Sequence, residues 1–62
     1  MKRVAFLKHL TAHGCQLKRE GSEHSIWIHP GNSRQTSIPR HRELSETLIK
    51  VICKQLEIPA PH

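Results

Sequence analysis

Aspartate is absent from this 62-residue chain, and its five acidic residues are all glutamates scattered along the sequence. Divalent-metal cleavage of phosphodiesters needs clustered carboxylates, because hard cations are held by several oxygen ligands at once. The composition therefore argues against a metal-dependent nuclease. We expect no bound metal and no small-molecule cofactor.

Cysteine is also scarce, since only Cys15 and Cys53 are present and they are far apart. Neither belongs to a C-x-x-C pair, which argues against a disulfide framework or a zinc ribbon and favours two buried thiols in a reducing compartment. His9 and His13 have the i, i+4 spacing of one helix face and could in principle bind zinc. A solvated or partly buried helix face is the commoner meaning of that spacing.

Long hydrophobic runs are missing as well. No stretch approaches the roughly 20 apolar residues that span a bilayer. Lys2 and Arg3 give a basic start, but the apolar run over residues 4–7 is too short for the core of a signal peptide. We therefore expect a soluble, cytoplasmic protein without a membrane partner.

What the chain does have is positive charge. Ten Lys and Arg against five Glu give a formal net charge of +5, which favours a polyanionic partner. A chain this short buries only about 60% of the surface that its unfolded form exposes, so a stabilising partner is a further expectation. Residues 1–62 show no repeat or linker and predict a single domain.

The first half of the chain predicts one helix followed by strands. Residues 2–13 place Val4, Leu7 and Leu10 at helical spacing, and Gly14 follows as a stop signal. Alternating patterns then predict three strands separated by two turns: strands over 15–18, 24–28 and 34–38, with turns over 19–22 and 29–32.

The second half predicts another helix. Ser45 is a suitable N-cap, the apolar stripe from Leu48 to Leu56 is amphipathic, and Pro59 ends the pattern. The order α-β-β-β-α predicts an α+β fold in which two helices pack on one face of a three-stranded antiparallel sheet.

Histidine offers a metal-free route to RNA cleavage. Such a reaction needs a proton acceptor near the 2′-hydroxyl, a proton donor for the leaving oxygen and cations around the phosphorane. His24 is the best placed of six histidines, because it follows a glycine-containing turn at the start of a predicted strand. Taken alone, a histidine at a strand start is more often an ordinary polar residue.

Several short elements together resemble the HicA family of small bacterial toxins. They are Gly21-Ser22-Glu23-His24, His29-Pro30, Ser37-Ile38-Pro39-Arg40-His41 and the helix end Ile52–Ile58. The resemblance implies a double-stranded-RNA-binding-like fold and a ribonuclease of a type II toxin–antitoxin system that cleaves messenger RNA and arrests translation. It also implies neutralisation by a HicB-type antitoxin in a heteromeric complex.

The resemblance assigns the catalytic role to His24, which matches the histidine of the family's Gly-Ser-x-His element. Substrate-binding candidates surround it in the sequence: Lys18, Arg19, Gly21, Ser22, Arg40 and His41. For Arg40, phosphate binding competes with simple solvation, because single surface arginines are common. The alternative for Gly21 and Ser22 is an ordinary turn, and for His41 it is packing or capping near the second helix.

Strand alternation links the site to the core. If His24 faces outward, Ile26 and Ile28 face outward too and Trp27 points toward the helices. The apolar strip beside His24 would then suit an antitoxin surface. The opposite register would bury both isoleucines and expose Trp27 as a base-stacking platform. We favour the first arrangement.

Two other functions are alternatives to a ribonuclease toxin. A non-catalytic RNA-binding module of the same fold would keep a basic face and salt-dependent affinity without turnover. A DNA-binding subunit is disfavoured, because the second helix carries Glu46 and Glu57 and few basic side chains for a major groove.

Overall fold

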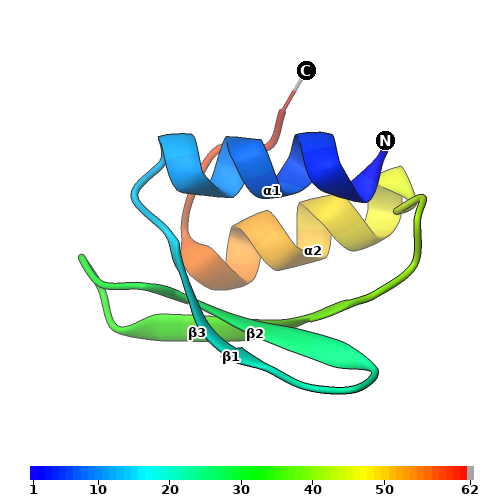
Figure 1. The fold of residues 1–62 in the computed structure, drawn as a ribbon. Helices are drawn as coiled ribbons and strands as arrows, with labels where there is room; N and C mark the ends of the chain where they lie inside the picture. The colour runs from blue at the N-terminus through cyan, green and yellow to red at the C-terminus, as the bar shows by residue number, and fades with distance from the viewer. Residues whose placement is uncertain (62) are drawn as a thin grey trace.

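The computed structural model describes residues 1–61 and contains the five predicted elements in the predicted order. These are α1 (Arg3–Ala12), β1 (Gln16–Glu20), β2 (His24–His29), β3 (Arg34–Pro39) and α2 (Glu46–Leu56). The strands form one antiparallel sheet in the order β1-β2-β3, and both helices lie on the same side of it (Figure 1). The α+β prediction is therefore confirmed.

Strand β2 is the central strand of the sheet. Its side chains alternate between the face that packs on the helices and the opposite, outer face. Trp27 is only 8% exposed and faces the helices, whereas Ile26 and Ile28 are half-buried on the other face and His24 is exposed. The predicted orientation of Trp27 is confirmed. Residues 24, 26 and 28 therefore form the outer face of β2, away from both helices.

Helix α2 follows the sequence prediction closely. The Leu48 amide donates to the Ser45 hydroxyl oxygen at 3.2 Å, which is the expected N-cap interaction. The buried residues of the helix recur at positions i, i+3, i+4 and i+7: Ile49, Ile52, Cys53 and Leu56. After the helix, Glu57 adopts a left-handed conformation, and Pro59 lies just beyond.

Helix α1 buries only part of the apolar set that the sequence pattern selected. Phe6 and Leu10 are fully buried, whereas Val4 is 66% exposed and Leu7 is only partly buried. The helix has apolar residues on more than one side, so the 3.6-residue period does not single out the inward face. Packing against the rest of the core selects the Phe6–Leu10 stripe.

Strand β1 also differs from its prediction, because it continues to Glu20 where a turn was expected from residue 19. Its pairing with β2 shifts between Leu17 and Arg19, which is the signature of a β-bulge. Beyond this irregularity Arg19 pairs with Ile26 and Glu20 with Ser25. The bulge thus sends Glu20 to the helix side of the sheet and Arg19 to the outer face.

The edge position of β1 explains a second difference. Cys15 is buried as expected, but Leu17 is 47% exposed although the alternation placed both on the same side. Leu17 does pair with Trp27 and shares its inward face. It lies on the edge strand, however, where the helices do not cover it completely.

Both cysteines are free and buried, as predicted, and burial raises the pKa of each thiol. No helix within residues 1–61 is long and apolar enough to cross a membrane.

Candidate functional site

The turn between β1 and β2 presents His24 at the end of the sheet. His24 begins β2 and pairs with Pro39 on β3, so its exposed side chain lies on the outer face of the sheet. Two shallow hollows meet there. One is lined by Arg19, Gly21, Ser22, Glu23, His24 and Ile26, and the other by Ser22, Glu23, His24, Pro39, Arg40 and His41.

Most of the predicted site residues therefore lie together, but Lys18 does not line either hollow. Its ammonium group donates to the Gln35 side-chain oxygen at 2.8 Å. Gln35 is the cross-strand neighbour of Ile28, so Lys18 lies further along the outer face than His24 does. Arg19 and Arg40 are the predicted cations that share a hollow with His24.

Gly21 closes the turn by an approach that only glycine permits. Its amide donates to the His24 carbonyl oxygen at 2.8 Å. A Cβ atom at position 21 would lie 2.7 Å from that same backbone oxygen, well inside van der Waals contact. Position 21 therefore requires glycine because the His24 carbonyl group occupies the space that a side chain would fill.

The substitution Gly21→Ala is expected to lower the free energy of unfolding by about 1–3 kcal/mol, because the turn or the start of β2 must shift to admit the methyl group. Urea denaturation measures the loss. Gly31→Ala is the matched control, since a Cβ there would meet only the His29 ring, which can turn away. Equal losses in the two variants would contradict the close approach described for Gly21.

Arg40, the residue directly after β3, contacts the same turn. Its Nε donates to the Gly21 carbonyl oxygen at 2.9 Å, and its Nη2 lies 2.9 Å from Glu20 Oε2. Its backbone amide donates to the Glu23 carbonyl oxygen at 3.2 Å. Arg40, which is a predicted phosphate ligand, has two of its guanidinium nitrogens engaged within the protein.

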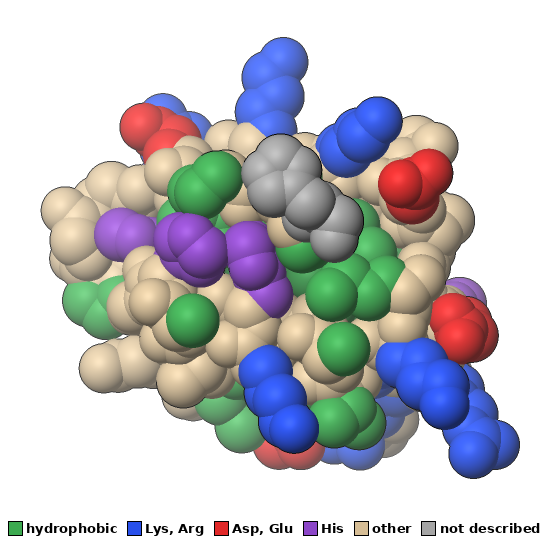
Figure 2. Space-filling model, turned by 90° about the horizontal axis from the view of Figure 1, so that it is seen from above, with side chains coloured by type: hydrophobic (Ala, Val, Ile, Leu, Met, Phe, Trp, Pro, Cys, Tyr) green, Lys and Arg blue, Asp and Glu red, His purple; other side chains and the backbone are tan. Residues whose placement is uncertain are grey.

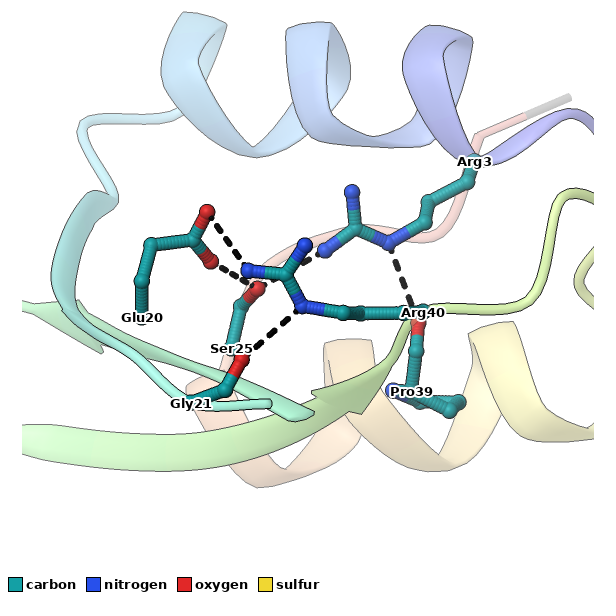
Figure 3. Close-up of polar contacts among 6 residues, drawn as sticks. All are labelled: Arg3, Glu20, Gly21, Ser25, Pro39 and Arg40. Carbon is teal, nitrogen blue, oxygen red and sulfur yellow. Dashed lines mark hydrogen bonds and ion pairs between the residues drawn. The ribbon is translucent and has the colours of Figure 1, made fainter. Parts of the chain in front are cut away.

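A second arginine extends this network to α1, as Figure 3 shows. Arg3 donates from Nε to the Pro39 carbonyl oxygen at 3.0 Å and from Nη2 to the Ser25 hydroxyl oxygen at 2.8 Å. The fully buried Ser25 donates in turn to Glu20 Oε1. This Ser25 hydrogen bond, with the positive charges of Arg40 and Arg3, lowers the pKa of the Glu20 carboxyl group against the opposing effect of desolvation.

Sequence reasoning assigned Arg3 no role beyond a basic start. A clue to the role of Arg3 lies in β2. The alternation of this strand places Ser25 on the helix side, as it does Trp27. A buried hydroxyl group requires hydrogen-bond partners. The partners come from distant positions, since Arg3 and Ser25 are 22 residues apart in the sequence.

The helix side of the molecule carries further histidines. Figure 2 shows this face, with several histidines in a row and the Lys and Arg side chains spread apart around its rim. The ring centroids of His9 and His13 are 4.3 Å apart, and His9 Nε2 lies 2.7 Å from the Pro59 carbonyl oxygen. Within residues 1–61, no three His, Cys or Glu side chains are grouped so that they could hold a metal ion.

Comparison with known proteins identifies the family. Residues 5–58 match the sequence model of a family described as HicA toxin of bacterial toxin-antitoxin. The chain belongs to the HicA toxin family. Searches among curated proteins and among solved structures give no match.

In this HicA toxin, the matched segment contains the whole β1–β2 turn, His24 and the β3 end that carries Arg40 and His41. The α-β-β-β-α order that the resemblance implied is the order observed. Family membership shows a toxin of a toxin–antitoxin system.

The chemistry available at this HicA site is proton transfer beside charged side chains, because Arg19 and Arg40 each line one hollow and Glu23 lines both. His24 offers an exposed imidazole, a group that serves as a general acid or base in proteins. Arg19 lines one of its hollows, and His41 lines the other. Both hollows are partly open to solvent.

Proposed function

We propose that this HicA toxin is a metal-independent endoribonuclease that cleaves messenger RNA and arrests translation, with His24 as general acid or base. The observation that carries the proposal is the placement of His24. It lies exposed on the outer face, at the meeting point of two hollows and beside Arg19.

The proposed reaction is an attack of the ribose 2′-hydroxyl on the adjacent phosphorus. A base removes the 2′-hydroxyl proton, and an acid protonates the 5′-oxygen as its bond to phosphorus breaks, which leaves a 2′,3′-cyclic phosphate. His24 performs one of these two transfers. Arg19 stabilises the charge on the phosphorane oxygens.

Other residues near the turn bind the substrate in this proposal. Lys18 contacts a phosphate further along the strand, because its ammonium group bonds Gln35, the cross-strand neighbour of Ile28 on the outer face. Gly21 and Ser22 offer a turn against which the RNA backbone can lie, and His41 contacts RNA from the second hollow.

The antitoxin of this pair is proposed to be a HicB-type protein that covers the same face. Ile26 and Ile28 expose part of their apolar surface there, next to the basic residues that bind RNA. A partner that covers these isoleucines would also cover His24, which begins the same strand. Inhibition would then follow from occlusion of the site.

The test is RNA cleavage by the purified chain in the presence of EDTA. We expect a messenger RNA to be cut at an unchanged rate when EDTA is added, and we expect expression of the chain to arrest growth. Cleavage that disappears with EDTA would indicate a metal-dependent reaction. RNA binding without cleavage would indicate the non-catalytic binding module instead.

A further inference from the structure

His24 owes its position to its backbone surroundings. Its carbonyl oxygen accepts the Gly21 amide at 2.8 Å, and it pairs with Pro39 across the sheet. The orientation of the imidazole therefore depends on how firmly the turn over residues 20–23 and the end of β3 are held.

The ion pair between Glu20 and Arg40 holds both of these segments. Arg40 follows Pro39 directly, and it contacts the turn at Glu20, Gly21 and Glu23 through one ion pair and two hydrogen bonds. Figure 3 shows the guanidinium group lying between the Glu20 carboxylate and the Gly21 carbonyl. The residues before His24 are thus joined to the strand that pairs with it.

The residue after His24 belongs to the same network. Ser25 donates to the second carboxylate oxygen of Glu20 and accepts from Arg3, which also donates to the Pro39 carbonyl oxygen. Contacts made by one carboxylate and two arginines therefore reach the chain before, after and across from His24.

We propose that Glu20 and Arg40 are positioning residues for His24, and that Arg40 acts through the turn rather than by binding phosphate. This inference rests on the ribonuclease function proposed above. Two features support it. Two guanidinium nitrogens of Arg40 are already engaged, and the neighbouring carboxylate cancels the charge that would attract a phosphate.

Global stability is a weaker explanation for the pair. The side chains of Arg40 and Glu20 are 43% and 51% exposed, and ion pairs at such exposure add little to the free energy of folding. A carboxylate beside an RNA site also repels phosphate. The pair as a whole carries no net charge and so adds little to substrate affinity, which leaves geometry as its contribution.

The variant Glu20→Gln separates geometry from charge, because the two predict opposite results. If Glu20 positions His24, kcat for RNA cleavage falls by about ten- to a hundredfold while KM changes little, since small displacements of a catalytic group are costly. If Glu20 matters only through its charge, removing a negative group tightens RNA binding and leaves kcat unchanged. That second result would overturn the proposal.

Arg40→Gln tests the same idea from the other side. A positioning residue leaves the salt dependence of RNA affinity unchanged, whereas a phosphate ligand lowers the slope of log K against log[salt] by about 0.7 when it is removed. We expect an unchanged slope and a reduced kcat. Arg34→Gln is the matched control, because it breaks the ion pair with Glu57 at the opposite end of the sheet and should leave kcat unchanged.

Amide hydrogen exchange of the free protein provides a readout that does not depend on cleavage. In Glu20→Gln and Arg40→Gln, exchange of the backbone amides at positions 21 and 40 should become at least several-fold faster than in the wild type. The Arg34→Gln variant should not show this. Unchanged exchange at these amides would overturn the positioning role. A wild-type protein that cuts no RNA would instead overturn the proposed ribonuclease function, whatever the exchange rates show.

Discussion

Replacing His24 with alanine is expected to lower the rate of RNA cleavage by about 10²–10⁴-fold, which is the usual contribution of one general acid or base. The side chain is exposed and lies outside the core, so the free energy of unfolding should change by less than about 0.5 kcal/mol. Single-turnover cleavage of a messenger RNA and urea denaturation measure the two quantities. Growth on expression should recover in parallel.

The matched control is His13→Gln, which removes a histidine at the end of α1, on a different element from the site. Its cleavage rate should equal that of the wild type. A His24→Ala protein that still cut RNA at a similar rate would remove His24 from the mechanism. A variant that lost both cleavage and folding would show instead that the residue is structural.

Replacing Phe6 with alanine is expected to lower the free energy of unfolding by about 3–5 kcal/mol, because a fully buried aromatic side chain is lost and a cavity remains. Domains of this size rarely have more than about 3–5 kcal/mol in total. The variant should therefore be largely unfolded at 25 °C. Circular dichroism and urea denaturation detect this directly.

Val4→Ala is the control within the same helix. Val4 is 66% exposed, so its truncation should change the free energy of unfolding by no more than about 0.5 kcal/mol. Similar losses at positions 4 and 6 would mean that the inward face of α1 has been assigned wrongly.

Much of the fold could be predicted from the sequence because local signals and burial agree there. Ser45 supplies a cap, and the apolar stripe of α2 has a single orientation. Once His24 is placed on the outer face, the alternation in β2 determines the orientation of the whole strand. It correctly predicts that Trp27 faces the core.

The predictions for α1 and β1 were partly wrong because their local sequence patterns are compatible with more than one structure. Helix α1 has apolar residues on two sides, so periodicity alone could not distinguish the Val4 side from the Phe6 side. The bulge after Leu17 changes the alternation of β1 midway along the strand, and only pairing with β2 fixes its place. Both outcomes depend on tertiary contacts that a single sequence does not contain.

The candidate site also combines features that the local sequence predicts with contacts that only the tertiary structure determines. The short motif around Gly21 and His24 marks the turn in the sequence, and the structure places most of the predicted residues around it. The engagement of Arg40 with Glu20 could not be predicted, because the two residues meet only when β1 and β3 flank the same end of β2. The contribution of Arg3 depends on a contact between α1 and β2.

The alternation of β2 has a consequence for how such a toxin can diverge. In the function proposed above, outward positions 24, 26 and 28 face RNA and the antitoxin, while inward positions 25 and 27 pack in the interior. Point substitutions can therefore alter either set without disturbing the other. A single inserted or deleted residue within the strand would exchange the two sets at once. We therefore expect variation among relatives in this strand to consist of substitutions, with length changes confined to the turns at its ends.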